Sequence, residues 1–217
     1  MLLHTSQLDQ FREYIKKLKW AVGEENANKI LSKSLYLVVA GSDDLANTYF
    51  TIGTRRQQYE MASHYCPHKL YRLGARRIAV FGILPIGCWP FQRTLAGGST
   101  RFCAEEYNQA AQLVNAKLSP TLDSLTQSLP QSRVVYVDIY NPLLDLIKYP
   151  QKYVGLKLVT GDTVAQETLK WSYCATDIVG HVQKLLSTYF WDSYHPTETA
   201  YKVLVDQIIQ KYINLFM

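Results

Sequence analysis

The sequence predicts an α/β fold with a parallel sheet, and two features carry that prediction. Short apolar, β-prone runs occur at residues 35–40, 77–82 and 134–139, and a stretch with helical periodicity precedes each run. Runs without alternating polar residues are typical of strands that helices cover on both sides. Alternation of helix and buried strand favours a parallel sheet with right-handed crossovers. With 217 residues, 47% of them hydrophobic, we expect one domain over residues 1–217.

The expected helices follow from the spacing of apolar residues. Residues 7–19 carry an apolar residue every three or four positions, which predicts an amphipathic helix, and a second helix is expected at 24–33. The helix before the third strand is marked by Ala110, Leu113, Leu118, Leu122 and Leu125. The last helix is capped by Thr197. Its predicted buried stripe is Tyr201, Leu204, Val205, Ile208, Ile209 and Tyr212.

Composition and charge disfavour several functional classes. The formal charge is +5, but the 23 Lys and Arg residues are scattered among 18 acidic ones, so no nucleic-acid partner is predicted. No segment approaches the roughly 20 apolar residues of a membrane span. The first residues lack the continuous apolar run of roughly 7 to 15 residues that a signal peptide needs, so no signal peptide is predicted in this chain. If its start is genuine, we expect a cytosolic protein.

Cysteine and histidine residues offer few metal-binding arrangements. Four cysteines allow three pairings if all of them form bridges: Cys66, Cys88, Cys103 and Cys174. The segment His64-x-Cys66-x-His68 resembles a ligand cluster. It lacks a nearby fourth ligand, and we expect it in a loop because Pro67 interrupts the helical pattern. No metal is therefore predicted.

The strongest candidates for catalytic residues lie near the C-terminus, in Trp191-Asp192-Ser193-Tyr194-His195-Pro196. An acid and an imidazole three positions apart can share a hydrogen bond that orients a general base. By spacing alone, a solvated acid beside a partly buried histidine is the commoner arrangement. Two further segments follow the first two expected strands, Gly41-Ser42-Asp43-Asp44 and Pro85-Ile86-Gly87-Cys88. Functional groups of parallel sheets gather outside the carboxyl ends of strands.

Four colinear segments together resemble the plant GDSL esterase/lipases, a branch of the SGNH hydrolases, and especially their extracellular-lipase group. They are Ser34–Phe50, Gly74–Cys88, Gln92–Gly98 and Trp191–Glu198. The resemblance implies a three-layer α/β/α, flavodoxin-like sandwich, incomplete here at the N-terminus. It also implies hydrolysis of carboxylic esters, with lipid or other acyl esters as small-molecule substrates. It further implies that no cofactor is needed and that the protein is secreted.

The resemblance implies a role for each matching residue. His195 corresponds to the general base and Asp192 to the acid that orients it. Gly41 and Asp43 correspond to the oxyanion-hole region, where Asp43 replaces the asparagine of the family pattern. The replacement exchanges an amide donor for an acceptor, and loss of one such donor can cost roughly 3 to 4 kcal/mol of transition-state stabilisation.

The family's nucleophile, the serine of an N-terminal Gly-Asp-Ser-Leu block, has no counterpart in this sequence. The tripeptide Gly161-Asp162-Thr163 resembles Gly-Asp-Ser in sequence, but no convincing strand precedes it. We therefore interpret it as a chance match. In a serine protease, removal of the nucleophile costs roughly a factor of 10⁶ in turnover. We therefore assign no nucleophile and expect this chain to be inactive or impaired.

Two structural expectations also come from the resemblance. Cys88 and Cys103 occupy family cysteine positions and form a bridge if the chain reaches an oxidising compartment. Cys174 lacks a family partner, because Thr160–Val164 replaces a Gly-Cys-Cys-Gly loop. Without the strand that precedes the nucleophile, Leu35–Ala40 becomes an exposed apolar edge, which predicts a protein partner that completes the sheet.

Two other functions compete with ester hydrolysis. The absent nucleophile and the exposed strand edge favour the hypothesis of a remnant that binds other proteins without catalysis. Irregular joins near residues 64 and 160 suit a decayed, truncated paralogue without a folded function.

Overall fold

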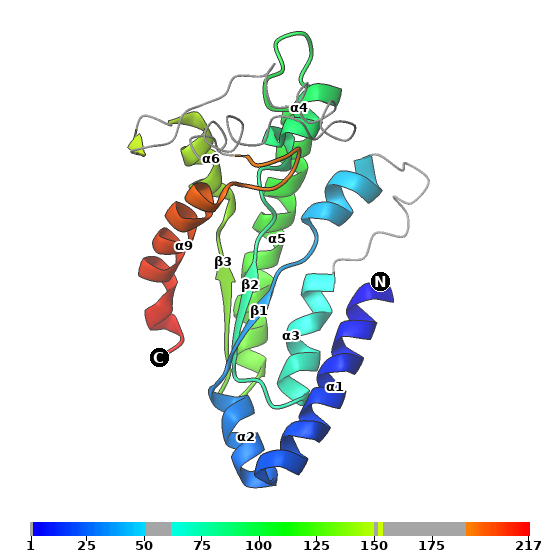
Figure 1. The fold of residues 1–217 in the computed structure, drawn as a ribbon, viewed down its shortest axis with the longest axis vertical. Helices are drawn as coiled ribbons and strands as arrows, with labels where there is room; N and C mark the ends of the chain where they lie inside the picture. The colour runs from blue at the N-terminus through cyan, green and yellow to red at the C-terminus, as the bar shows by residue number, and fades with distance from the viewer. Residues whose placement is uncertain (1, 51–61, 150–151, 154–189) are drawn as a thin grey trace, which may run out of the picture. The chain divides into compact units, whose positions relative to one another are not determined.

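The computed structural model describes residues 2–50, 62–149, 152–153 and 190–217 (Figure 1). The chain forms two compact units. Unit 1 contains Met1–Gly82, Val114–Val137 and Tyr212–Met217, and unit 2 contains Ile83–Leu113 and Asp138–Lys211. Each unit therefore combines segments that are distant in the sequence.

Unit 1 is built on a parallel sheet of three strands in the order β1 (Leu35–Val38), β2 (Arg77–Phe81) and β3 (Arg133–Val137). Along the central strand, Ile78 is in register with Tyr36 on one side and with Val134 on the other. The predicted α/β class with a parallel sheet is confirmed. The three predicted strands are confirmed as well, with boundaries shifted by one or two residues.

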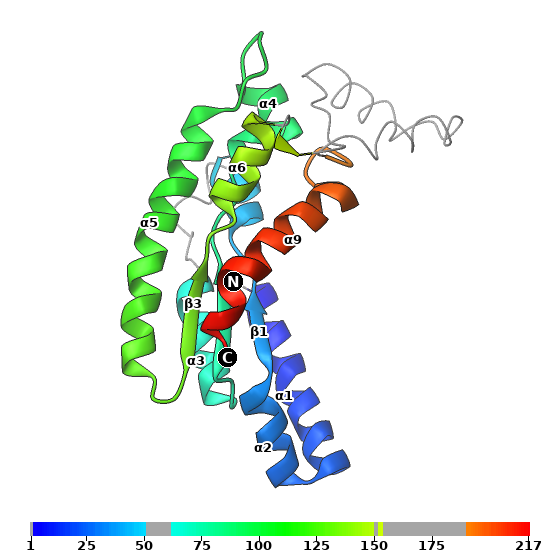
Figure 2. The same ribbon diagram turned by 90° about the vertical axis from the view of Figure 1, so that its left-hand side faces the viewer.

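Helices cover one face of this sheet. They are α1 (Leu2–Val22), α3 (Ala62–Arg72) and, within unit 1, residues 114–128 of α5 (Glu105–Ser128). In Figure 2, α1 lies on the side of β1, α5 lies on the side of β3, and α3 lies between them. A fourth helix, α2 (Glu24–Lys33), leads directly into β1 and has the predicted boundaries. Among the described helices of the chain, none is long and apolar enough to cross a membrane.

The core of unit 1 forms where the apolar faces of these helices meet the sheet. Alternate strand residues Val38, Ile78, Val80 and Val134 point to this side, and all are at most 7% exposed. The helices contribute Leu8, Leu70, Leu118 and Leu122. The period of two in the strands and the three-to-four spacing in the helices thus direct the same kind of side chain to one interior.

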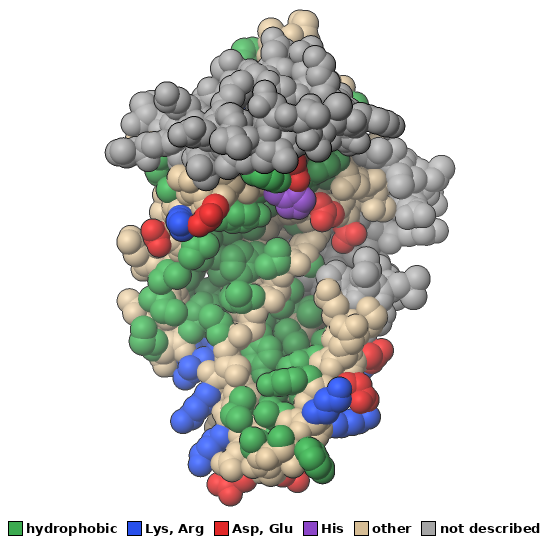
Figure 3. Space-filling model, viewed as in Figure 1, with side chains coloured by type: hydrophobic (Ala, Val, Ile, Leu, Met, Phe, Trp, Pro, Cys, Tyr) green, Lys and Arg blue, Asp and Glu red, His purple; other side chains and the backbone are tan. Residues whose placement is uncertain are grey.

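The opposite face of β1 is uncovered. Leu35, Leu37 and Val39 are 43, 62 and 68% exposed, so the expectation that helices cover residues 35–40 on both sides was wrong. Only the face with Tyr36 and Val38 packs against the core. The predicted exposed apolar edge is confirmed, and hydrophobic side chains gather over the part of Figure 3 where Figure 1 draws β1.

Helix α3 corrects the expectation of a loop around His64-x-Cys66-x-His68. The helix runs through Pro67, and the proline side chain is fully buried. Proline disfavours a helix interior because it lacks an N–H donor. Here Cys66, Leu70 and Tyr71 pack at the core of unit 1, and this tertiary burial outweighs the local preference.

Unit 2 contains the short helices η3 (Ile86–Cys88), α4 (Pro90–Ala96) and α6 (Tyr140–Lys148), the first part of α5, and most of α9 (Glu198–Tyr212). The predicted last helix is confirmed, but its predicted buried stripe is only partly right. Leu204 and Tyr212 are buried, whereas Tyr201, Val205 and Ile209 are 46 to 50% exposed. Residues four apart on a helix share a face, so these three form an uncovered row.

Replacing Leu122 by alanine should destabilise the protein strongly. Leu122 is 0% exposed in the core of unit 1, so Leu122→Ala loses apolar burial and leaves a cavity. We expect the free energy of unfolding, measured by urea denaturation, to fall by about 2 to 5 kcal/mol. Leu113→Ala, in the same helix but at a position 58% exposed, is the matched control and should change stability by roughly 0.5 kcal/mol or less. Equal effects of both substitutions would contradict this assignment of the core.

Candidate active site

The Asp192 carboxylate organises a tight loop in unit 2. One oxygen, Oδ1, accepts hydrogen bonds from the backbone N–H groups of Tyr194 and His195, both at 2.7 Å. The other oxygen, Oδ2, lies 2.7 Å from Nδ1 of the His195 ring. The backbone contacts curl the chain so that a residue three positions later brings its imidazole to the same carboxylate. The predicted pairing of acid and imidazole is therefore present.

The charge state of Asp192 follows from these contacts. Partial burial acts to raise its pKa, but the hydrogen bonds from the His195 backbone, the His195 ring and the Tyr194 backbone outweigh it, so the pKa lies below its ordinary value. The carboxylate is thus ionised at neutral pH and can only accept. In the neutral tautomer that satisfies this contact, Nδ1 carries the shared proton and Nε2 is the acceptor. The His195 side chain is 68% exposed, so a reactant can reach it.

Aromatic contacts with α4 hold this loop in place. The Tyr194 ring packs edge-on against Trp89, with ring centroids 5.6 Å apart, and lies 5.2 Å from the Phe91 ring. The backbone N–H of Phe91 also donates to the carbonyl of Ser193 at 3.2 Å. Sequence reasoning missed Trp89 and Phe91, because no local pattern links residues so far from the loop.

The loop closes on itself and passes directly into α9. Phe190 and Pro196 form an antiparallel bridge, and the Trp191 N–H donates to the His195 carbonyl at 2.7 Å. Thr197 is buried, and its Oγ1 accepts the Ala200 N–H at 3.3 Å, which confirms the predicted helix cap. His195 therefore stands two residues before Thr197, the cap of α9.

Gly41 and Asp43, predicted for the oxyanion-hole region, lie in unit 1 just after β1. Gly41 has a φ of +106°, a conformation that favours glycine, and its carbonyl accepts the Leu45 N–H at 2.8 Å. This turn opens into η1 (Asp44–Phe50), where Leu45 and Ala46 are buried. The Asp43 side chain is exposed.

The segment after β2 is held by a disulfide and a buried amide. Cys88 and Cys103 form a disulfide with Cα atoms 4.3 Å apart, which confirms the bridge implied by the resemblance. The Gly87 N–H donates to Asn108 Oδ1 at 2.9 Å. A side chain at Gly87 would meet the Ala104 carbonyl oxygen at 2.1 Å, so only glycine fits this packing.

Other candidate groups contribute less. Gly161-Asp162-Thr163 and Cys174 lie outside the described residues. Within the described ranges, no three His, Cys, Asp or Glu side chains are grouped so that they could hold a metal ion. Cys66 is a half-buried free thiol whose pKa is raised by burial, so it is a poor thiolate nucleophile.

Neutralising Asp192 should remove a pH-dependent part of the stability. Because the pKa of Asp192 is lowered in the folded protein, its contribution is present at neutral pH and is lost as the pH falls through the folded-state value. Asp192→Asn keeps an oxygen for the backbone N–H groups but loses the charge. We expect a lower free energy of unfolding than in the unmodified chain at neutral pH, with the difference shrinking below about pH 4. Urea unfolding across this range measures it.

The control for this experiment is Asp206→Asn, which neutralises an exposed carboxylate on α9. A constant difference between Asp192→Asn and the unmodified chain at all pH values would contradict the assigned charge.

Comparisons with a family profile and with known proteins agree on one family. The profile of the family described as GDSL-like lipase/acylhydrolase matches residues 3–208. The chain is 46% identical to GDSL esterase/lipase EXL3 of Arabidopsis thaliana, over 97% of this chain and 60% of that protein. It is 40% identical to GDSL esterase/lipase EXL2 of the same organism, over 96% of this chain and 58% of that protein. It is also 42% identical to GDSL esterase/lipase At5g42170 of that organism, over 97% of this chain and 58% of that protein. The chain thus spans about 60% of the length of these relatives. The chain belongs to the GDSL-like lipase/acylhydrolase family.

Proposed function

We propose that this chain supplies the general base and its orienting acid to a carboxylic ester hydrolase. The observation that carries the proposal is the 2.7 Å contact between Asp192 Oδ2 and His195 Nδ1, which leaves Nε2 of an exposed imidazole as a proton acceptor. Its substrates are small-molecule esters, including lipid or other acyl esters, in keeping with the family.

The proposed reaction uses a serine from a Gly-Asp-Ser block, which this sequence does not contain. Nε2 of His195 accepts the serine proton while the hydroxyl oxygen attacks the ester carbonyl. Asp192 stabilises the resulting imidazolium. The imidazolium then returns the proton to the departing alcohol, and the same base activates a water that releases the acid from the serine.

By the family resemblance, the turn at Gly41 and Asp43 in unit 1 corresponds to the oxyanion-hole region of the family. A carboxyl group at Asp43 in place of the family's asparagine removes an amide donor for the developing negative charge. We therefore propose reduced activity even when a nucleophile is present.

We also propose that the protein is secreted. Structural disulfides persist in oxidising environments, and the bridge between Cys88 and Cys103 fits such a compartment. Family relationship to extracellular lipases supports the same location.

Joining a segment with a Gly-Asp-Ser block from a family relative ahead of residue 1 should produce esterase activity. We expect hydrolysis of a short-chain p-nitrophenyl ester and serine labelling by a fluorophosphonate probe, because His195 then has a hydroxyl to deprotonate. His195→Ala should lower turnover by roughly 10⁶-fold and Asp192→Asn by about 10⁴-fold.

The matched control is the same extended protein with the serine of the added block replaced by alanine. The 217-residue chain without the added block should show neither turnover nor labelling. A well-folded extended protein that has no turnover would end the proposal.

A protein partner that adds a strand to the sheet is a second element of the proposal. It is supported by the exposed apolar face of β1, with Leu37 and Val39 both more than 60% exposed. Exposed apolar side chains at the edge of a sheet favour pairing with another chain. The occupant would be a polypeptide segment that extends the sheet beside β1.

The isolated chain should therefore self-associate. Leu37→Lys places a charge on the uncovered face of β1 and should shift the sedimentation profile toward monomer without lowering the free energy of unfolding. Leu95→Lys, on α4 at a position 60% exposed, is the matched control and should sediment like the unmodified chain. A stable, monodisperse monomer of the unmodified chain would count against the proposed partner.

A further inference from the structure

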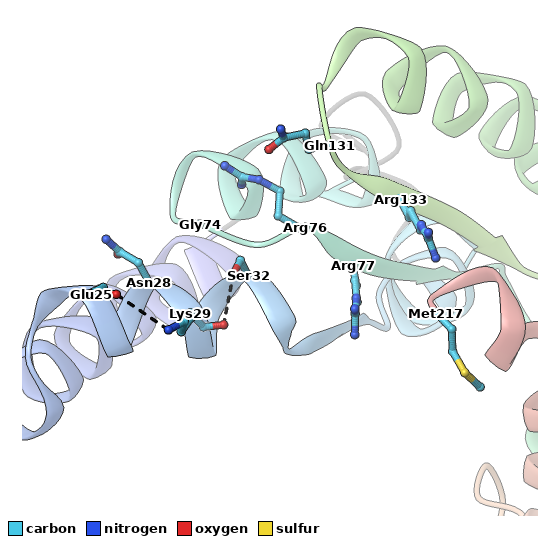
Figure 4. A pocket seen from close by; sticks show the side chains of 10 residues that line it. All are labelled: Glu25, Asn28, Lys29, Ser32, Gly74, Arg76, Arg77, Gln131, Arg133 and Met217. Atoms are coloured by element: carbon cyan, nitrogen blue, oxygen red, sulfur yellow. Dashed lines mark hydrogen bonds and ion pairs between the residues drawn. The ribbon is translucent and has the colours of Figure 1, made fainter.

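A basic pocket lies in unit 1 at the amino ends of β2 and β3, the opposite end of the sheet from the Gly41 turn. Its volume is about 680 Å³. The side chains that Figure 4 labels come from α2, the two strand ends and the C-terminal segment. The pocket is lined by Glu25, Asn28, Lys29, Ser32, Gly74, Arg76, Arg77, Gln131, Arg133 and Met217.

Two arginines face each other across the strands of this pocket. Arg77 and Arg133 open β2 and β3 and are register partners, so their side chains leave the sheet on the same face. Figure 4 shows both pointing to the same side, away from Arg76. Like charges on neighbouring strands of one face repel each other unless something neutralises them.

No described carboxylate provides that neutralisation. The ion pairs among the described residues leave out Arg77 and Arg133. Glu25 is the acidic side chain among those lining the pocket, and its Oε1 lies 3.8 Å from Lys29 Nζ. The two guanidinium groups therefore present an excess of positive charge to the pocket.

Each guanidinium group makes one hydrogen bond to a backbone carbonyl and keeps donors to spare. Arg77 donates to the carbonyl of Lys33 at 3.2 Å, at the end of α2, and Arg133 to the carbonyl of Leu215 at 3.5 Å. A guanidinium has five N–H donors, so these single contacts leave most of them for a ligand. Arg76 differs, because its guanidinium stacks over the Tyr71 ring at 4.3 Å and donates to two nearby carbonyls.

We propose that Arg77 and Arg133 bind the phosphate group of a ligand in this pocket. A phosphate presents several oxygens at once, so it can accept hydrogen bonds from two neighbouring guanidinium forks and neutralise both charges. Lys29 and Ser32 lie on α2 at the side of the same pocket, but Lys29 is paired with Glu25 and the Ser32 hydroxyl donates to the Lys29 carbonyl, so the two arginines carry the proposal. The site is independent of Asp192 and His195 and of the proposed ester hydrolysis.

Titration of the chain with inorganic phosphate, followed by calorimetry at low salt, tests this site. We expect saturable binding that Arg77→Gln and Arg133→Gln each weaken by roughly 10-fold or more, since each removes charge-assisted hydrogen bonds. Arg133→Lys should bind with intermediate affinity, because it keeps the charge but loses the fork. Arg12→Gln, which removes an exposed arginine on α1, is the matched control and should bind like the unmodified chain.

Cosedimentation with vesicles separates the two sources of the phosphate group. Vesicles of phosphatidylcholine with a minor fraction of phosphatidic acid should retain the chain if the ligand is a lipid headgroup, and phosphatidylcholine alone should not. Binding of inorganic phosphate without retention on vesicles assigns the site to a soluble phosphate compound. Cooperative thermal unfolding of each variant shows that it is folded. Phosphate binding that is absent, or unchanged in folded Arg77→Gln and Arg133→Gln, would overturn the proposal.

Discussion

Pairing and packing around the central strand β2 are the constraint on which unit 1 depends. This strand is hydrogen-bonded to β1 along one edge and to β3 along the other, and Ile78, Ala79 and Val80 are each at most 2% exposed. Because its side chains alternate between two faces, a register shift of one residue would exchange the two sets. The helices that pack on Ile78 and Val80 would then lose their contacts, so this register also decides where α1, α3 and α5 lie.

A single carboxylate has a comparable role in unit 2. Asp192 folds the loop through two backbone hydrogen bonds and orients the His195 ring through a third contact. The loop is in turn braced by Tyr194 against Trp89 and Phe91, and it ends at a capped helix. An imidazole held in this way loses little further freedom when a reactant arrives, which is what the proposed role as general base requires.

The two ends of the sheet in unit 1 differ in chemistry for a reason common to parallel sheets. The carboxyl end of β1 runs into a glycine turn and η1, where backbone N–H groups begin a new helical segment. At the amino ends, the first residues of β2 and β3 are not yet enclosed by the core and can be arginines. Parallel pairing aligns these first residues side by side, and this alignment concentrates positive charge.

Much of this protein was determined by its sequence alone: the α/β class, the three strands, the boundaries of α2, the Thr197 cap and the acid–imidazole pair at Asp192 and His195. These features depend on periodicity, or on contacts between residues close in the chain. Other features required the tertiary structure. The helix through Pro67, the exposed face of β1 and the uncovered row Tyr201, Val205 and Ile209 all depend on which segments pack against them. The bracing of Tyr194 by α4 and the pairing of Arg77 with Arg133 join residues distant in sequence. Hydrophobic patterning says which residues can be buried, but only the packed chain decides which of them are covered.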